Sequence, residues 1–494
     1  MKLPRGWTET TLGNLLFGIY TGKSMRCEER PPRDGELGVV KVSAVTWGRF
    51  DSSQSKTLPS DYRPPEEARI REGDLLISRA NTLDLVGSVV LVDSEPRDLF
   101  LSDKILRLAL SEETKTWVFW FLRSKWGREQ IKNLATGNQL SMRNISQDAL
   151  CRIRHPLPPA AEQRRVVAKL DVLTVRLTRA RAELERSPQL IDHFRISALR
   201  AGVTGKLTEG WRVTATNAVP VETLLLKVSS PQQGRGGREA TDKIIPGIAG
   251  LAVNDPGTNL PKGWKWVSLL RISKQETGHT PSRSQPSYWD GGVPWIGIRD
   301  AGAHHGRHIE ETIQKISKVG LSNSSARLLP PGTVCLSRTA SVGYVTIMAR
   351  SMATSQDFAT WTCTEALLPD YLMYALMAEG EDIRKFGMGS THTTIYFPEI
   401  RALHIALPPL EEQREIIIRI KQSLARADRL EAEAARGRAL LDRLGSSILA
   451  KAFEGALVPQ DPNDEPASVL LDRIRVQRAS ASKAKPRSGN RITA

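Results

Sequence analysis

Two long segments of the chain carry mostly apolar residues alternately three and four positions apart, the pattern of a coiled-coil helix. In the first segment these positions are Val166, Leu170, Leu173, Leu177, Ala180, Leu184, Ser187, Ile191, Phe194 and Ala198. In the second they are Ile416, Ile420, Ser423, Ala427, Leu430, Ala434, Gly437, Leu441, Leu444 and Ile448. Both stripes are interrupted at the same place, at Ser187-Pro188 and at Gly437. The pattern predicts two long helices with a local kink there.

A helix with one apolar stripe buries it against its own domain, against another chain or against a second helix. Because one chain carries two equal stripes, we expect them to pack on each other, antiparallel, as two spacer helices. Pairing between copies of the chain is the alternative. About 40 residues at about 1.5 Å each would give a rod on the order of 60 Å.

The sequence contains an internal repeat, which indicates a tandem duplication. Leu3–Trp7 (LPRGW) returns as Leu260–Trp264 (LPKGW). Pro156–Arg164 (PLPPAAEQR) returns as Ala406–Arg414 (ALPPLEEQR), and from there the two copies keep one register, 250 positions apart. We expect the tryptophans of the LPxGW motif, Trp7 and Trp264, to be core or junction anchors.

The part of each copy that precedes its helix mixes short β-rich runs with helical stretches. The runs include Val39–Val45, Leu75–Ser78 and Val334–Ser337, and the stretches include Lys115–Arg128 and Asp370–Phe386. The predicted class is mixed α/β (α+β): two tandem α/β domains separated by two long antiparallel coiled-coil helices, with a pseudo-two-fold internal repeat. The predicted boundaries are 1–157 and 260–407 for the globular domains, 158–228 and 408–477 for the spacer helix regions, 229–259 for a flexible linker and 478–494 for a basic disordered tail.

The net charge points to a polyanionic partner. The 494 residues contain 70 Lys+Arg and 54 Asp+Glu, a formal charge of +16, and 40% of them are hydrophobic. This composition is that of a soluble globular chain, and nucleic acid is the commonest partner of such a surplus. A generally basic proteome or the basic tail is the alternative, but the five basic residues of 478–494 explain only part of the charge.

Several classes of function have no signal in the sequence. No apolar run approaches the roughly 20 residues of a membrane span, and the N-terminus has no secretory pattern, so we expect no membrane contact and a cytoplasmic location. Four cysteines far apart in sequence fit a reducing compartment. We find no zinc-ligand spacing, no GxxxxGK[ST] phosphate loop, no [DNS]PP[YFW] tetrapeptide and no GxSxG. We therefore expect no catalytic residue, no metal site and no cofactor bound by this chain, and a role in recognition.

Four strings in the second copy carry a specific resemblance. They are Thr280–Arg283 (TPSR), Tyr288–Ile296 (YWDGGVPWI), Ser324–Thr333 (SSARLLPPGT) and Leu407–Gln413 (LPPLEEQ). With the duplicated LPxGW motif and long helices, the chain resembles the specificity subunit of type I restriction–modification systems, usually called HsdS. The first copy lacks the TPSR and YWDGGVPWI strings, so its recognition loops cannot be inferred from the second.

The resemblance implies a non-catalytic DNA sequence-specificity subunit. Its two α/β domains would be target-recognition domains, each recognising one half of a bipartite, asymmetric site in double-stranded DNA, and the helices would act as a ruler between them. Its partners would be two adenine-N6 methyltransferase (M) subunits, which use S-adenosylmethionine, and motor-nuclease (R) subunits, which use ATP and Mg²⁺.

Base recognition in the major groove needs Arg, Asn, Gln or Lys on loops, and phosphate contacts need basic or hydroxyl groups. In the first domain the candidates are Arg79, Asn81, Lys104, Thr136, Asn138, Gln139 and Arg143. In the second they are Arg338, Thr339, Gln356, Ser390, Thr391 and His392. For each of them a surface turn or an internal hydrogen bond is the alternative.

Two other functions remain as alternatives. The recognition half of a self-contained restriction–methylation enzyme would need a methyl-donor motif and a nuclease motif, and the sequence shows neither. A coiled-coil scaffold with two protein-binding heads is weakened by the charge of +16.

Overall fold

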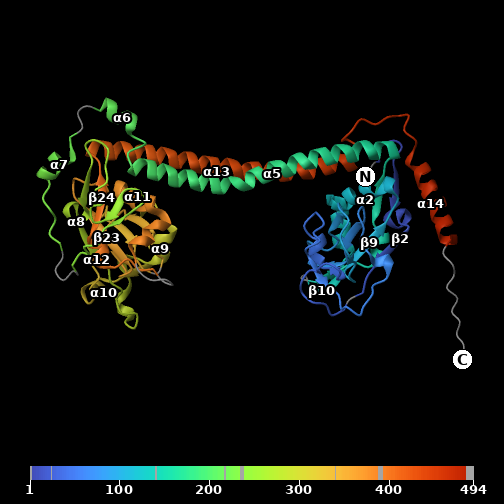
Figure 1. Cartoon of the computed structure of the whole chain (residues 1–494), viewed down its shortest axis with the longest axis horizontal. Coiled ribbons are helices and arrows are strands. Elements are labelled where there is room, and N and C mark those ends of the chain that lie inside the picture. Colours follow the sequence, from blue (N-terminus) through green and yellow to red (C-terminus); the bar gives the residue numbers. More distant parts are fainter. Residues whose placement is uncertain are drawn as a thin grey trace. The chain divides into compact units, whose positions relative to one another are not determined.

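The computed structural model describes residues 3–23, 25–139, 142–215, 219–233, 239–339, 341–387 and 393–484. Contacts divide the chain into two compact units (Figure 1). The first unit consists of Met1–Leu184 with Arg436–Ala494, and the second consists of Glu185–Ala435. None of the helices in the described part of the chain combines the length and apolar character that a membrane span requires.

The two predicted stripes form two helices of 44 residues each, α5 (Ala160–Val203) and α13 (Leu410–Phe453). In the first unit Arg181 of α5 pairs with Asp442 of α13 at 2.8 Å. In the second unit Arg195 of α5 pairs with Asp428 at 2.8 Å and with Glu431 at 2.7 Å. In the first unit the next contact along α5 joins Leu184 to Gly437, and in the second unit it joins Gly202 to Ile420. Partner numbers in α13 thus fall as those in α5 rise within each unit, so the helices run antiparallel, as expected for pairing within one chain.

Burial follows the predicted stripes. In the first unit Val166 and Leu170 are fully buried, and in the second Ile416, Ile420 and Ala427 are. Three predicted stripe positions are more exposed: Phe194, Leu430 and Leu444, at 36%, 43% and 49%. Both helices continue through the predicted kink positions. At Gly437 a Cβ atom would lie 3.2 Å from Leu184 Cδ1, so a small residue lets the two helices approach closely there.

The globular domain of the first unit is built on a four-stranded antiparallel sheet of order β2-β9-β5-β7. Its strands are β2 Gly18–Thr21, β9 Ile105–Ala109, β5 Leu75–Ser78 and β7 Val89–Leu91. Three smaller sheets are β4-β3-β8 (Ser55–Thr57, Gly38–Val40, Leu99–Phe100), β10-β11-β6 (Thr136–Gln139, Met142–Asn144, Ala80–Asn81) and β1-β12 (Thr8–Thr11, Arg154–Leu157). The helices of this unit are α1 Leu12–Leu15, η1 Val42–Val45, η2 Glu66–Ala68, α2 Glu112–Arg123, α3 Lys125–Leu134, α4 Gln147–Cys151 and α14 Ala467–Ala484.

The globular domain of the second unit has the same plan. Its main sheet has the order β16-β23-β20-β21-β18 (Ser273–Thr277, Phe358–Cys363, Val334–Ser337, Val345–Met348, His308–Ile309). The smaller sheets are β19-β17-β22 (Gln314–Ile316, Trp289–Ile296, Ala353–Thr354) and β13-β14-β24-β15 (Ile245–Pro246, Leu251–Val253, Leu403–Leu407, Lys265–Ser268). The helices are α6 Glu209–Thr214, α7 Val221–Lys227, α8 Leu269–Ile272, η3 Pro286–Tyr288, α9 Ile298–Ala303, α10 Lys318–Ser322, α11 Pro369–Glu379, η4 Gly380–Phe386 and α12 Phe397–Arg401.

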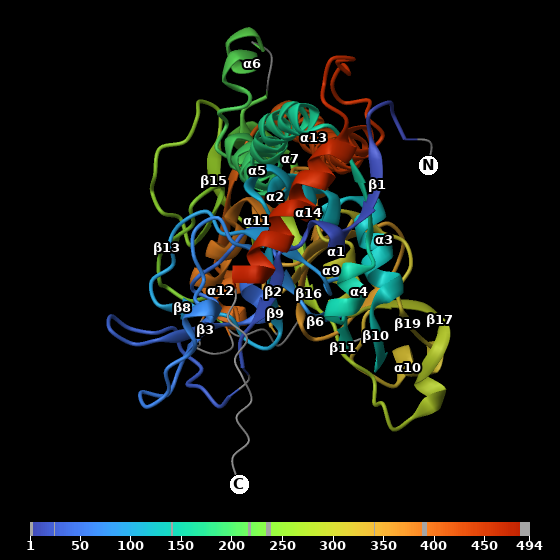
Figure 2. The ribbon, with the colours of Figure 1, turned by 90° about the vertical axis from the view of Figure 1, so that its right-hand side faces the viewer.

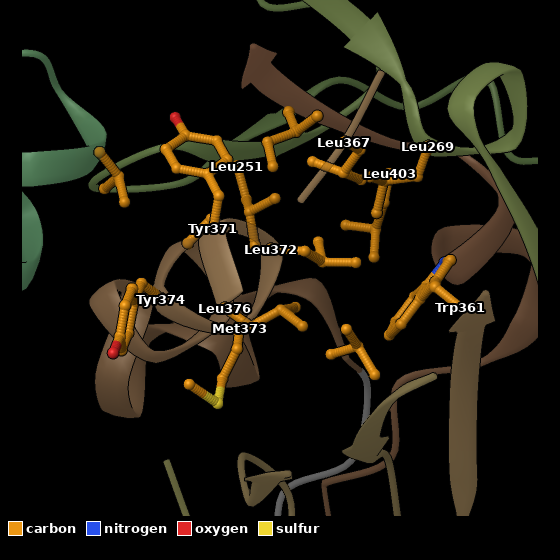
Figure 3. Close-up of a cluster of buried hydrophobic side chains, with 14 of the residues drawn as sticks. Leu251, Leu269, Trp361, Leu367, Tyr371, Leu372, Met373, Tyr374, Leu376 and Leu403 are labelled. Carbon is orange, nitrogen blue, oxygen red and sulfur yellow. The ribbon is translucent and has the colours of Figure 1, made fainter. Parts of the chain in front are cut away.

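The core of the second unit forms where α11 covers its sheets. Figure 3 shows Tyr371, Leu372 and Leu376 of α11 gathered with Leu251 and Trp361. The Tyr371 hydroxyl donates to the Ala406 carbonyl at 2.7 Å, which satisfies its polar atom within the core. In the first unit α2 takes the place of α11, and its Trp117 and Phe121 are buried in the equivalent core.

Several predicted boundaries are wrong in their details, each for a local reason. The helix predicted at Lys115–Arg128 divides at Ser124, which ends α2 and accepts a bond from Gly127 N as the N-cap of α3. The helix predicted at Asp370–Phe386 divides at Gly380, whose φ of +57° ends α11 before η4. The run Val39–Val45 is a strand only to Val40 and then becomes η1.

The predicted flexible linker, 229–259, is partly ordered. β13 and β14 lie within it, and β14 pairs antiparallel with β24. The buried carboxylate of Glu379 fixes this segment by accepting bonds from the backbone N–H groups of Ile248, Ala249 and Leu251, at 2.8 to 3.2 Å. Burial raises the pKa of Glu379, and the three N–H groups oppose that rise.

The predicted disordered tail, 478–494, is helical at its beginning, because α14 continues to Ala484. Residues 485–494 of that predicted tail lie outside the described residues. α14 packs beside α1 (Figure 2), and Arg478 donates to the Asn14 carbonyl at 3.0 Å. The start of α14 is fixed by a bond from Ala467 N to the Gly6 carbonyl at 2.9 Å, so the helix belongs to the first unit.

Candidate DNA-recognition surfaces

The LPxGW and LPPxxEQ motifs meet at the start of each long helix. In the first unit the Trp7 indole N–H donates to Glu162 at 2.9 Å, and in the second the Trp264 indole donates to Glu412 at 2.8 Å. Both tryptophans are 7% exposed, which confirms the prediction that they are anchors. These motifs therefore join each α/β domain to its helix.

The glutamine of each LPPxxEQ motif holds the turn that leads into the helix. Gln413 Nε2 donates to the Pro408 and Ala366 carbonyls at 3.1 and 2.9 Å, while its Oε1 accepts from Leu368 N. Gln163 Nε2 donates to the Pro158 carbonyl at 2.8 Å. Gln413 thus uses both the donor and the acceptor of its amide, whereas Gln163 Oε1 is buried without a partner among the described residues.

In the first unit most predicted DNA-contact residues gather at the end of β5. Arg79 N donates to the Lys104 carbonyl at 2.7 Å, and Asn81 pairs with Arg143 across β6 and β11. The Asn81 amide also donates to Thr46 Oγ1 at 3.4 Å, whereas the exposed Lys104 ammonium has no partner among the described residues.

The hairpin β10–β11 extends this edge. Thr136 Oγ1 donates to the Asn144 carbonyl at 3.5 Å, so this hydroxyl already takes part in an internal bond. Gln139 faces Met142 in the hairpin register, but the side chains of the predicted contacts Asn138 and Gln139 lie outside the described atoms.

In the second unit the predicted residues gather at the end of β20, which is equivalent to β5. Arg338 Nη2 donates to the Gln356 carbonyl at 3.0 Å, and its guanidinium lies 4.4 Å from the centre of the Phe397 ring. Thr339 Oγ1 donates to Asp357 Oδ1 at 2.6 Å, and Gln356 Oε1 accepts from Thr280 Oγ1 at 2.6 Å. The predicted contacts Ser390, Thr391 and His392 lie outside the described residues.

The two predicted clusters occupy equivalent places. Ile145 N donates to the Arg79 carbonyl, and Ile395 N donates to the Arg338 carbonyl, each at 2.9 Å. Arg338 is held more tightly than Arg79 because it stacks on Phe397, and burial lowers its pKa. Its Nε atom is nevertheless buried without a partner in the described part of the chain. The same edge of each domain therefore presents cationic donors, and contact of these residues with DNA remains a prediction.

The sequence did not single out an exposed aromatic residue beside the first cluster. Trp47 is 74% exposed and lines a pocket of about 350 Å³ with Arg123 and Arg128. Burial lowers the pKa of both arginines, and Arg123 stacks on Phe119 at 4.9 Å. The only sequence signal was a tryptophan in a polar, glycine-containing turn, which is too common to be selective.

The described residues contain no group of three or more His, Cys, Asp or Glu side chains that could hold a metal ion. The two clusters offer hydrogen-bond donors and positive charge, which suit contacts to phosphates and base edges.

The comparisons with known proteins show which proteins and domains the chain resembles. Residues 261–435 match the family model described as "Type I restriction modification DNA specificity domain". The matched segment contains the main sheet of the second unit and the first part of α13, so this part of the chain is a DNA specificity domain.

The similarity extends over the whole chain. It is 24% identical to the type I restriction enzyme EcoKI specificity subunit of Escherichia coli (strain K12), over 97% of each chain. It is 26% identical to the StySPI specificity subunit of Salmonella potsdam, over 97% of this chain and 96% of that one. Over its whole length the chain is therefore similar to type I restriction enzyme specificity subunits, and the family's DNA specificity domain matches within its second half.

The fold is similar to that of a solved chain. A solved chain described under "Structural basis underlying complex assembly and conformational transition of the type I R-M system" matches with a TM-score of 0.61 and 23% identity. The match covers 92% of this chain and all of that one. Two tandem α/β domains with long helices are therefore the architecture of this chain.

Proposed function

We propose that this chain recognises a bipartite, asymmetric site in double-stranded DNA, with one half-site for each recognition domain. The observation that carries the proposal is the repeated domain plan. Both domains keep four equivalent strands in the main sheet and the same bonds around Arg79 and Arg338, but the side chains on that edge differ. Two equivalent domains with unlike surfaces are suited to two unlike half-sites.

We further propose that α5 and α13 set the gap between the half-sites. Ion pairs and the close approach of Leu184 to Gly437 fix the register of the two helices. A helix rises about 1.5 Å per residue and B-DNA about 3.4 Å per base pair, so helix length converts directly into a number of base pairs.

The catalytic steps would belong to partner subunits. We propose that two adenine-N6 methyltransferase subunits, which use S-adenosylmethionine, and motor-nuclease subunits, which use ATP and Mg²⁺, dock on this chain. The outer faces of the long helices and their Leu-Pro-Pro entrances are the proposed surface for the methyltransferase subunits. The similar solved chain is described in terms of complex assembly of the type I R-M system, which supports partners for that protein.

The charge of +16 supports a DNA partner over a protein-binding scaffold. The test is binding of the purified full chain to a pool of duplex DNA at several salt concentrations. The logarithm of the affinity should fall linearly with the logarithm of salt concentration, and an affinity independent of salt would favour the scaffold. A map of modified adenines in cells with and without this chain, coexpressed with methyltransferase subunits, tests the specificity itself. A split motif that appears only with the chain is expected.

A further inference from the structure

Two pockets of nearly equal size lie at equivalent places in the two recognition domains. The first, of about 410 Å³, is lined by residues that include Lys23, Lys41, Lys56 and Lys104. The second, of about 420 Å³, is lined by residues that include Arg283, Arg299, Gln314 and Asp357. Each pocket lies within one unit, so neither depends on how the units are arranged.

The backbone establishes that the two pockets are equivalent. A Cβ atom on Gly22 would lie 1.7 Å from the Leu101 carbonyl oxygen, and one on Gly278 would lie 2.0 Å from that of Thr354. In each domain the glycine therefore lies where its segment closely approaches a second segment, Leu101 in the first domain and Thr354 in the second. Beside it, β3 runs parallel to β8 in the first domain, as β17 runs parallel to β22 in the second.

The registers of these strands show which lining residue of the first pocket corresponds to which lining residue of the second. Lys56 lies opposite Val39, and Gln314 lies opposite Trp295, in the equivalent strand pairs. The Lys104 carbonyl accepts from Arg79 N, and the Asp357 carbonyl accepts from Arg338 N.

A third match follows from the glycines. Cys27 and Arg283 each lie five positions after their glycine, and each lines its pocket. Lys104, Lys56 and Cys27 of the first domain are thus replaced by Asp357, Gln314 and Arg283 in the second.

The lining of the first pocket is cationic on balance, because its four lysines outnumber the carboxylates of Glu29 and Asp103. Lys41 and Lys56 both pair with Glu29, which fixes them in the wall. Lys23 and Lys104 are exposed, and neither ammonium group has a partner among the described residues. Two cationic donors therefore remain available for acceptors such as the O6 and N7 atoms of guanine.

The second pocket contains a guanidinium that two contacts hold in place. Arg283 lies 4.8 Å from the Trp289 ring centre, and its Nη2 donates to Gln314 Oε1 at 3.2 Å. Its remaining N–H groups are not used in these contacts. Arg299 is exposed and has no partner in the part of the chain that the structure describes. A planar, oriented guanidinium is the group best suited to bidentate recognition of a base edge.

We propose that these equivalent pockets are the sites at which the two domains contact base edges in the major groove of duplex DNA. The exchange of their lining side chains would make the two half-sites unlike. The inference rests on the proposed function, and it adds Lys23, Arg283 and Arg299 to the residues that contact bases.

The test is selection of bound sequences from a randomised duplex library by the purified full chain, at fixed salt concentration. The variants Arg283→Ala and Lys104→Ala are compared with the wild-type chain. We expect each variant to lose discrimination at one or two base positions in a single half of the selected motif, and the two variants to affect different halves. The expected loss is between about fivefold and about 150-fold per bidentate contact.

Matched controls separate base contact from loss of charge or fold. Lys125→Ala and Arg307→Ala remove exposed cations that do not line the pockets, and should leave the motif unchanged. Arg283→Lys keeps the charge but loses the planar fork, so it should relax the motif while most of the total affinity remains. Circular dichroism shows whether each variant keeps its fold.

The other outcomes count against the proposal. An unchanged motif in Arg283→Ala and Lys104→Ala would overturn it. A uniform loss of affinity with an unchanged motif would mean phosphate contacts, and would overturn it as well. If the wild-type chain selected no motif at all, the proposed function itself would fail, which is a different result from a motif that the variants leave intact.

Discussion

The buried carboxylate of Glu412, at the start of α13, should stabilise the fold much more than the equivalent carboxylate of Glu162 at the start of α5. Glu412 is 1% exposed and accepts from Trp264, Thr208 and Arg212, the last at 2.5 Å. Glu162 is equally buried. Among the described residues it accepts from the indole N–H of Trp7, but it has no hydroxyl or guanidinium donor like those of Glu412. Its Oε1 atom has no partner in that part of the chain.

The magnitudes follow from what each truncation leaves behind. Glu412→Ala leaves a mostly buried guanidinium, a hydroxyl and an indole N–H without their acceptor, which should cost about 3–5 kcal/mol. Glu162→Ala leaves one indole N–H without an acceptor and removes a carboxylate whose pKa burial raises. Its net cost should be about 1 kcal/mol.

Hydrogen exchange of the full-length chain, with mass spectrometry of its peptides, measures the two effects separately. A two-unit chain is not expected to unfold in a single step, so local protection is more informative than one melting temperature. Glu412→Ala should lower protection around Trp264 and the first turns of α13. Glu162→Ala is the matched control at the equivalent position. Equal losses, or a larger loss for Glu162→Ala, would refute the argument.

Two other predictions concern buried polar groups. His155 is fully buried with neither ring nitrogen bonded among the described residues, and burial lowers its pKa from 6.5 to about 3. The unfolded chain therefore takes up a proton as pH falls below about 6.5 and the folded chain does not, so stability should fall by about 2 kcal/mol between pH 7.5 and pH 5. Hydrogen exchange of the peptides around β12 at the two pH values, corrected for the intrinsic exchange rates, checks this. His155→Ile, which introduces the residue found at the equivalent Ile405, should raise stability at neutral pH and remove this part of the pH dependence, and a destabilised variant would contradict the prediction. Glu379→Ala should cost more than about 3 kcal/mol, because three backbone N–H groups lose their acceptor, and unchanged hydrogen exchange across β13 and β14 would count against it.

The elements that local sequence determines were predictable. The heptad stripes identified both long helices, because few structures other than a paired helix produce a 3.5-residue period over about five heptads. The repeated LPxGW motif located the two anchors. β13 and β14 were missed because they are short and lie in a segment rich in glycine and polar residues, and only pairing with β24 and the carboxylate of Glu379 fixes them.

The candidate site was less predictable. The end of β5 was found because Arg79 and Asn81 directly follow a recognisable strand. The paired pockets were missed because their lining comes from segments far apart in sequence: Lys23 and Lys41 lie before β4, whereas Lys104 follows β8. Only the strand registers show that Lys56 corresponds to Gln314, since the loops of the two copies have different lengths.

The central claim is that two unlike domains recognise a split site whose gap is set by the paired helices. The most direct measurement is a modified-adenine map in cells that express partner methyltransferase subunits with the chain. The wild-type chain is compared with one that carries a four-residue helical insertion after Ala182, matched by another in the opposing part of α13 near Leu440. The insertion adds about 6 Å of helix, so both half-sites should stay the same while the gap grows by about one to two base pairs. An unchanged gap, or a single continuous site, would contradict the claim.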